Sequence, residues 1–230
     1  MPVKREKMFT TINKDIIVMS QVVFKQMQYI KELINASEVS TSEIEFFNNE
    51  LVLDSFEVKM RRNIINSMVL YGPRTSDMRR LMACYDITLN MERVGDLLVN
   101  IHKELKRVNL DGALYQAVVT KLRDLEDIAE RMLTNAIKSY SSEDVNLTRS
   151  TIEMDDFADE IHVSIEDDIV EFRKNTSMQE SEVLEIIALS SISHNLERIA
   201  DYSTNIVESS FYLVKGSNIQ HVDIDEVLNQ

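Results

Sequence analysis

A stretch of this chain occurs twice. Residues 87–101 and 192–206 align without a gap at an offset of 105, and seven of the fifteen positions are identical. The identical pairs are Ile87/Ile192, Asn90/Asn195, Glu92/Glu197, Arg93/Arg198, Asp96/Asp201, Asn100/Asn205 and Ile101/Ile206. Shared helical periodicity explains matched apolar positions, but most of these matches are polar. The repeat therefore predicts a chain built from two copies of one unit.

The same offset also relates the segments that precede these two. It pairs Glu50 with Asp155, Asp54 with Asp159, Val58 with Val163 and Ile64 with Ile169. One register thus joins two long segments in each copy. We expect a first repeat at 1–110, a second repeat at 111–216 and a short tail at 217–230, with the two repeats packed in pseudo-twofold symmetry.

The chain contains few glycine and proline residues, which favour turns. Only four Gly and two Pro occur among 230 residues, too few for the many turns of a sheet protein, so the chain is predicted to be all-α. Ser40 with Glu43 and Ser177 with Glu180 have the spacing of capping boxes, which open helices. Six long helices follow from the 3.6-residue period, and short connections make them antiparallel neighbours. The expected helices are about 8–36, from the Ser40 box to 70, 76–108, 114–140, 142–175 and from the Ser177 box to 215.

Charge and cysteine content exclude several classes of protein. The formal net charge of −14 argues against nucleic-acid binding and against adsorption to an anionic membrane. It suits cation binding or a basic partner, although solubility alone would also account for it. The lone cysteine, Cys84, can form neither a disulfide framework nor a thiolate zinc site and is expected in the core. No apolar run approaches the roughly 20 residues of a membrane span, which predicts a cytoplasmic protein.

Acidic residues recur in pairs four positions apart. Residues at this spacing lie one turn above each other, where like charges destabilise a helix and a cation between them would remove the penalty. Asn100 and Asn205 add an amide oxygen one turn further. Oxygen-only ligands suit Mg, Ca, Mn or oxidised Fe, and we expect the ion in a groove between helices, near solvent. The candidate ligands are Glu50, Asp54, Glu92, Asp96 and Asn100 in the first repeat, and Asp155, Asp159, Glu197, Asp201 and Asn205 in the second.

Other residues near these pairs have weaker roles in the prediction. Arg93 and Arg198 could hold the carboxylates by hydrogen bonds or form ordinary surface ion pairs. A small residue, Gly95 or Ala200, precedes one aspartate of each repeat and allows close approach of a helix or a ligand. The four histidines, His102, His162, His194 and His221, are not expected to be ligands, because a di-iron site needs a carboxylate-x-x-His motif on two helices. Glycine-rich phosphate loops and common catalytic motifs are absent from the sequence.

These motifs resemble the paired signature of the PhoU family of phosphate-signalling regulators. The resemblance rests on Asn-Met-Glu-Arg-Val-Gly-Asp at 90–96 and Asn-Leu-Glu-Arg-Ile-Ala-Asp at 195–201, which continues to Asn205. Residues 72–79 and 211–216 also match the family's pattern, so the resemblance covers nearly the whole chain. Two positions depart from that pattern, with Ala200 where the family usually has Gly and Asp155 where the first repeat has Glu. Both departures bear on which metal would bind.

The resemblance implies a fold and a function. PhoU proteins are tandem three-helix bundles that bind metals, often iron or zinc, through these acidic motifs, here at the ten candidate ligands. They are regulators rather than enzymes and commonly form homodimers. They link the ATPase of the phosphate ABC transporter (PstB-like) to a membrane sensor histidine kinase (PhoR-like), and so repress phosphate uptake and the phosphate-starvation response.

Two alternatives belong to other classes of protein. A carboxylate-bridged metalloenzyme would need histidine ligands and a buried, open metal position. A metal-free helical scaffold would use the acids only to contact a basic partner, and it should keep that partner after treatment with a chelator. A regulatory domain of a larger phosphate transporter is a variant of the favoured hypothesis.

Overall fold

The computed structural model describes residues 2–36, 40–174, 180–217 and 219. The predicted cap at Ser177, His221 and the tail from 220 onward lie outside the described residues. The described part of the chain consists of six α-helices and contains no strand, so the predicted all-α class is confirmed. The helices are α1 (Pro2–Ile34), α2 (Glu43–Tyr71), α3 (Thr75–Leu105), α4 (Ala113–Ser142), α5 (Asn146–Lys174) and α6 (Glu180–Lys215).

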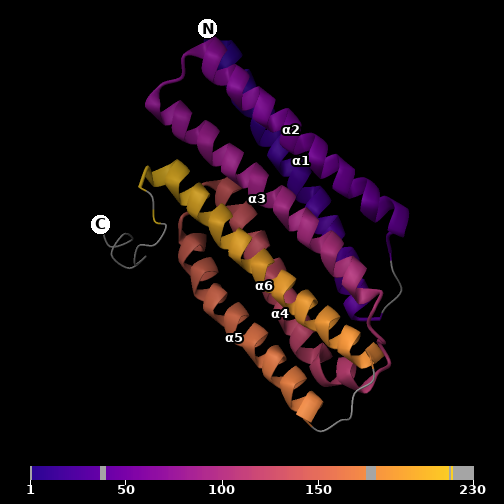
Figure 1. Cartoon of the computed structure of the whole chain (residues 1–230). Helices are drawn as coiled ribbons and strands as arrows, with labels where there is room; N and C mark the ends of the chain where they lie inside the picture. Colours follow the sequence, from indigo (N-terminus) through magenta and orange to yellow (C-terminus); the bar gives the residue numbers. More distant parts are fainter. Residues whose placement is uncertain (1, 37–39, 175–179, 218, 220–230) are drawn as a thin grey trace.

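The six helices form two three-helix units that pack side by side. α1, α2 and α3 pack on one another, as do α4, α5 and α6. α3 and α6 run next to each other through the middle of the molecule, whereas α2 and α5 form its opposite outer edges (Figure 1). The predicted division after residue 110 falls in the link between α3 and α4 and stays a prediction.

α2 begins two residues later than the capping box at Ser40 predicts. Ser42 is the cap residue, and its hydroxyl accepts a hydrogen bond from the backbone N–H of Glu45 at 3.2 Å. Ser40 instead donates its backbone N–H and its hydroxyl to the carboxylate of Glu32, at 2.7 and 2.8 Å. The predicted cap is wrong because the end of α1 already binds Ser40.

The predicted breaks at glycines are confirmed at two helix ends. Gly72 ends α2 with φ 52°, and Gly216 follows α6 with φ 77°, a left-handed conformation that glycine adopts without strain. α4 continues to Ser142, and Glu143 takes φ 54°, so α5 begins at Asn146 rather than at 142. The sequence missed this shift because Ser142 and Glu143 carry no conspicuous stop signal.

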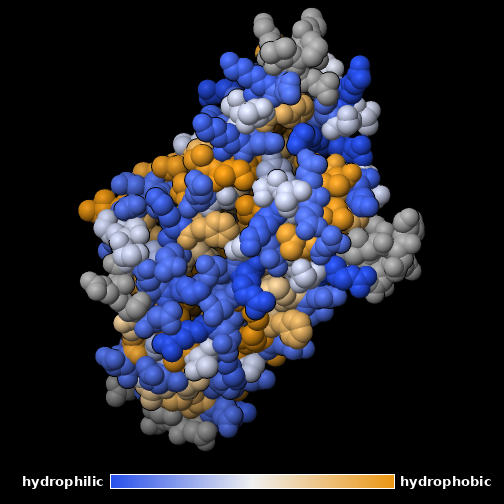
Figure 2. All heavy atoms as spheres, turned by 180° about the vertical axis from the view of Figure 1, so that it is seen from behind, coloured by the Kyte–Doolittle hydropathy of each residue, from blue (hydrophilic) through white to orange (hydrophobic). Residues whose placement is uncertain are grey.

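One continuous hydrophobic core runs through both repeats and receives side chains from all six helices. Cys84 lies within it, fully buried, as predicted. Seen from behind, hydrophobic atoms also gather on the upper left edge of the molecule, the side on which α2 lies (Figure 2). Among the described residues, no helix combines the length and the apolar character needed to cross a lipid bilayer.

Candidate metal centre

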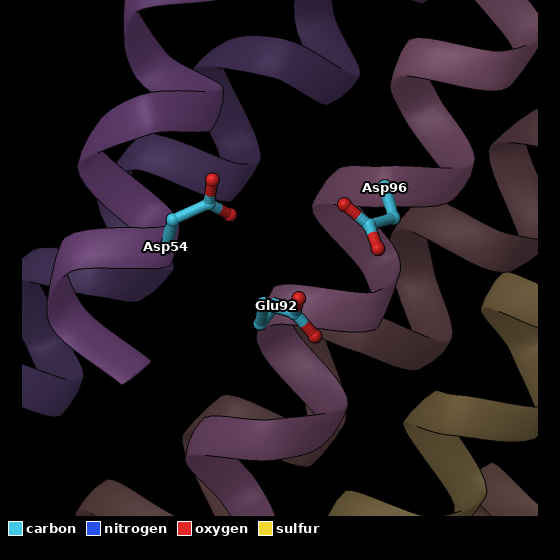
Figure 3. A group of neighbouring side chains, drawn as sticks. All are labelled: Asp54, Glu92 and Asp96. Carbon is cyan, nitrogen blue, oxygen red and sulfur yellow. The ribbon is translucent and has the colours of Figure 1, made fainter. Parts of the chain in front are cut away.

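Three of the predicted carboxylates meet between α2 and α3. Asp54 on α2 points toward Glu92 and Asp96, which lie on successive turns of α3 (Figure 3). One oxygen from each carboxylate lies within 4.8 Å of the others. Asp54 and Asp96 are exposed and Glu92 is half-buried, so the cluster is open to solvent. Three acidic oxygens at this spacing could hold a cation.

The approach of α2 to α3 depends on Gly95, which lies between Glu92 and Asp96. A Cβ at this position would come within 2.4 Å of Leu53 Cδ1 and 3.4 Å of Gln26 Oε1. Leu53 is buried and is the residue directly before Asp54. The small residue noted in the sequence therefore allows a neighbouring helix to pack closely, and this brings Asp54 of α2 near the carboxylates of α3.

The carboxylates of the first cluster repel one another. Burial raises the pKa of Glu50, Glu92 and Asp96, and Asp54 raises all three further. Lys103 works in the opposite direction and lowers the pKa of Glu50 and Asp96. A cation placed among these carboxylates would relieve the repulsion. Asn100 is exposed one turn beyond Asp96 on α3.

The second repeat places four carboxylates between α5 and α6. Burial raises the pKa of Asp155 to about 7, with Asp201 and Asp159 adding to the shift. Burial and Asp201 likewise raise the pKa of Glu197. Asp155 Oδ1 is buried and has no hydrogen-bond partner within the described structure. A cavity of about 540 Å³ adjoins this cluster, lined by Asp155, Arg198, Asp201, Tyr202, Thr204, Asn205 and Glu208.

The two clusters differ in how tightly they are drawn together. Asp159, Glu197 and Asp201 correspond to the first trio but do not gather within the same 4.8 Å in the described structure. The helix contact beneath them also differs, because Ala158 and Ala200 take the places of Leu53 and Gly95, and both alanines are fully buried. A large residue facing glycine in one repeat is thus replaced by two small residues in the other.

One histidine, His194, lies beside the second cluster. His194 Nδ1 lies 3.2 Å from Glu197 Oε2, and its ring is 5.8 Å from that of His162. His162 Nδ1 in turn lies 2.8 Å from the hydroxyl of Ser193. The repeat pairs His194 with Leu89, so no duplicated motif drew attention to it. The available signal was its position three residues before Glu197, which places both on one helical face. His102 lies elsewhere, buried at 3.1 Å from Glu43.

The two arginines of the repeat meet on a residue that the sequence did not single out. Arg93 and Arg198 both lie over the ring of Tyr202, with Cζ 5.7 and 5.6 Å from the ring centroid. Arg198 also donates a hydrogen bond to the Tyr202 hydroxyl at 2.7 Å. They act on the carboxylates through charge, since Arg93 lowers the pKa of Glu92 and Arg198 that of Asp201. The contact of Arg93 with Tyr202 therefore joins α3 of one repeat to α6 of the other, whereas the contact of Arg198 with Tyr202 lies within α6.

A third acidic group lies between α1 and α4, at the junction of the repeats. Glu126, Asp127 and Glu130 have oxygens within 4.8 Å of one another, but Lys31 already lies among them. Lys31 Nζ is 2.6 Å from Asp127 and 3.4 Å from Glu126. An ammonium group thus supplies the positive charge in this third acidic group.

The fold and the two acidic clusters define a class, namely a tandem three-helix repeat protein with an acidic cluster between two helices of each repeat. A family model described as the PhoU domain matches residues 16–105 and 122–210, one match in each repeat. The chain therefore belongs to the PhoU family, as its motifs predicted.

Curated relatives match over nearly their full length. A protein of Aquifex aeolicus named "Phosphate-specific transport system accessory protein PhoU homolog" is 26% identical over 93% of this chain and 94% of its own. A protein of the same name from Pseudomonas aeruginosa is 22% identical, over 93% of this chain and 86% of its own.

Two solved structures share the fold. The crystal structure of PhoU from Pseudomonas aeruginosa superposes with a TM-score of 0.82 at 18% identity, over 92% of this chain and 99% of that one. The phosphate transport system regulatory protein PhoU from Streptococcus pneumoniae gives a TM-score of 0.63 at 17% identity, over 94% of this chain and 95% of that one. At these identities the likeness supports the tandem helical architecture.

Proposed function

We propose that this protein is an accessory regulator of phosphate transport. It restrains phosphate uptake and the phosphate-starvation response by contacting the ATPase of the phosphate ABC transporter and a sensor histidine kinase. The observation that carries this proposal is the match of both repeats to the PhoU domain. Relatives of similar length that carry the name of a phosphate-specific transport system accessory protein support it. The protein would act in the cytoplasm, by binding rather than by catalysis.

We further propose that both acidic clusters bind metal ions. The ten candidate residues would hold them, from Glu50, Asp54, Glu92, Asp96 and Asn100 in one repeat to Asp155, Asp159, Glu197, Asp201 and Asn205 in the other. The donors fit a cation, because the carboxylates raise one another's pKa and Asp155 Oδ1 is buried without a partner. Iron or zinc is the proposed ion, with Mg, Mn or Ca as alternatives. A bound ion would supply positive charge that braces α2 against α3 and α5 against α6.

Metal content tests the second half of this proposal. The purified protein and a Glu92→Ala/Asp96→Ala/Glu197→Ala/Asp201→Ala variant are compared by inductively coupled plasma mass spectrometry after resupply of metal. We expect near-stoichiometric metal in the wild type and its loss in the variant. Asp127→Ala/Glu130→Ala is the matched control, because Lys31 already neutralises that cluster, and it should keep the metal. Equal metal content in all three proteins would contradict metal binding by these carboxylates.

The regulatory half is tested in cells. A strain that lacks the protein carries a reporter of the phosphate-starvation response and is grown in ample phosphate. We expect the reporter to be active without the protein and repressed when the wild type is restored. Capture of the transporter ATPase by the purified protein is measured in parallel, with and without a chelator. If the reporter stays repressed in the deleted strain, the regulatory role is wrong; if partner capture survives the chelator unchanged, the acids serve as a metal-free contact surface.

A further inference from the structure

The second repeat carries two histidines at positions where the first repeat has none. His162 on α5 and His194 on α6 correspond, at the offset of 105, to Glu57 and Leu89. The two imidazole rings lie 5.8 Å apart from centre to centre, so this pair spans the two helices. Neither histidine belongs to the duplicated acidic motif. A role for this pair would therefore distinguish one repeat from the other.

Each histidine lies three residues from a carboxylate of the second cluster. On α5 the order is Asp159-x-x-His162, and on α6 it is His194-x-x-Glu197. Residues three apart share one face of a helix. Because α5 and α6 pack against each other and run antiparallel (Figure 1), both histidines fall on the same side of the acidic cluster. The reversed order on α6 explains why a search for carboxylate-x-x-His motifs finds only the α5 member.

The contact between His194 and Glu197 has the spacing of two ligands on one ion. His194 Nδ1 lies 3.2 Å from Glu197 Oε2. Glu197 Oε2 is buried and accepts no hydrogen bond from the residues that the structure describes. Two ligands of a tetrahedral zinc ion, each about 2.0–2.1 Å from the metal, lie about 3.3 Å apart. The two atoms are therefore close enough to share an ion but are not aligned as a hydrogen bond.

His162 is oriented by a buried hydroxyl. Its Nδ1 lies 2.8 Å from the hydroxyl of Ser193, which is fully buried. Metal-binding histidines commonly donate one ring N–H to a fixed acceptor, which leaves the other ring nitrogen for the ion. Two imidazoles on one zinc ion hold their ring centres about 5–6 Å apart, and the observed separation falls in that range.

One side-chain movement would complete this set of ligands. In the described part of the chain, the two histidines and Glu197 do not bring three ligand atoms within 4.8 Å of one another. The side chain of His194 is 58% exposed, against 17% for that of Glu197. His162 is held by Ser193. Rotation of the exposed His194 ring about its side-chain bonds therefore closes the set without disturbing the core.

The first repeat offers no nitrogen ligand at the equivalent place. Leu89 has no donor atom in its side chain, and Glu57 forms an ion pair with Arg61 at 2.7 Å. The first cluster is thus limited to oxygen ligands. Carboxylate oxygens suit Mg²⁺ and Ca²⁺, whereas imidazole suits zinc, copper, iron and nickel. The two repeats therefore differ in the kind of ion that their donor atoms favour.

We propose that the second repeat holds a mixed nitrogen and oxygen site for Zn²⁺, with the ligands His162, His194, Asp159 and Glu197. The two imidazoles determine its specificity, because they favour Zn²⁺ over Mg²⁺ and Ca²⁺. The first cluster, with oxygen ligands alone, keeps the preference of a hard cation. This inference rests on the proposed metal binding and names the ion of one of its two sites.

Zinc affinity in a protein with only the second cluster intact tests this site. Glu92→Gln/Asp96→Asn removes two carboxylates of the first cluster and serves as the background. In it, His194→Gln and His194→Leu should each weaken Zn²⁺ binding at least about tenfold in competition with a chelating dye, since loss of a group that only orients a ligand already costs 10–100-fold. Mg²⁺ binding should stay unchanged. A general loss of structure would weaken both ions.

His102→Gln in the same background is the matched control. His102 also contacts a glutamate, with Nε2 3.1 Å from Glu43 Oε1, but it lies in the first repeat. This variant should bind Zn²⁺ as the background does. The His194→Leu variant introduces the residue that the first repeat has at this position, and all variants should keep the helical circular dichroism of the wild type.

X-ray absorption at the zinc K-edge identifies the ligands directly. Zinc-loaded background protein should show the outer-shell scattering of imidazole rings, and His194→Gln should reduce it. Scattering from oxygen ligands alone would overturn the inference, as would unchanged zinc affinity in both His194 variants. Either result leaves metal binding by the carboxylates standing. A background that binds no zinc also overturns the inference, and the metal content of the wild type then decides the proposed function separately.

Discussion

At Gly95 the missing side chain leaves room for Leu53, and the equivalent positions in the second repeat are the buried Ala158 and Ala200. Helix propensity alone favours alanine over glycine by about 1 kcal/mol, so glycine here reflects packing. The sequence showed that a small residue precedes the aspartate. It could not show which side chain occupies the space, because that depends on how α2 and α3 are placed.

We predict that Gly95→Ala destabilises the protein even though it improves helix propensity. The new Cβ would meet Leu53 Cδ1 at 2.4 Å, and overpacking of this kind costs about 1–3 kcal/mol. Leu53→Ala alone should cost about 2–5 kcal/mol because it opens a cavity. The double variant reproduces the alanine pair of the second repeat. Its free energy of unfolding should fall by less than the sum of the losses in the two single variants. Chemical denaturation of all four proteins measures the coupling, and strict additivity would contradict the shared contact.

Glu126 is the most deeply buried carboxylate described, at 1% exposed. Burial raises its pKa to about 8, and Lys31, which Asp127 and Glu130 also bind, only partly opposes this. The sequence could not predict this, since Glu126 is one acid among 39 acidic residues. Its burial follows from the packing of α4 against α1, which brings together segments of different repeats.

The raised pKa of Glu126 makes the free energy of unfolding depend on pH. Between its usual pKa of 4.5 and the raised value of about 8, the folded protein holds a proton on Glu126 that the unfolded chain has lost. The free energy of unfolding should therefore fall as pH rises through this window, by at most about 1.4 kcal/mol per pH unit. We predict that Glu126→Gln removes this fall, whereas Asp127→Asn, an exposed neighbour on the same lysine, keeps it. Urea denaturation across the window measures it, and parallel curves for wild type and Glu126→Gln would contradict the prediction.

The six helices were predictable because the polar repeat and the scarcity of glycine and proline fixed their number and order. Their ends were less predictable. α3 ends at Leu105 and α5 begins at Asn146, each several residues from the expected position. Helix ends depend on which groups satisfy the terminal N–H and C=O groups, and those groups often come from other helices. Ser40 illustrates this, because Glu32 of α1 removes it from the cap.

We predict that Ser42→Ala destabilises the protein by about 1 kcal/mol, the usual effect of losing a helix cap. The Ser42 hydroxyl accepts from the backbone N–H of Glu45, and alanine leaves that donor without its acceptor. Ser40→Ala, at the position that sequence alone favoured, should cost less because Ser40 caps no N–H of α2. Thermal unfolding of both variants compares them, and a larger effect at Ser40 would contradict the assignment of the cap.

At the scale of the whole molecule the two repeats share one core. α3 and α6 pack along each other, and Arg93 of α3 and Arg198 of α6 both contact the ring of Tyr202. The duplication was visible in the sequence, but this junction was not, because residues that join two copies need not repeat. Tyr202 corresponds to Leu97 in the first repeat, which is buried.

We predict that the metal-free protein unfolds in one cooperative transition. Unfolding of one repeat would expose the apolar faces of α3, α4 and α6. The remaining repeat would then lose part of its core, so we expect both repeats to unfold together. Differential scanning calorimetry should give equal calorimetric and van't Hoff enthalpies. Two resolved transitions, or a van't Hoff enthalpy near half the calorimetric one, would show that the repeats unfold independently.

The tight trio between α2 and α3 and the looser set between α5 and α6 are unequal copies of one acidic cluster. Two identical sites would fill over the same range of free ion, whereas each difference of about 1.4 kcal/mol in binding free energy separates their midpoints by a factor of ten. If both clusters bind ions as proposed, a chain with unequal clusters would pass through empty, singly filled and doubly filled states as the supply of the ion rises. The duplicated unit would then respond to ion concentration in two steps, with a singly filled intermediate state that one bundle with one site could not provide.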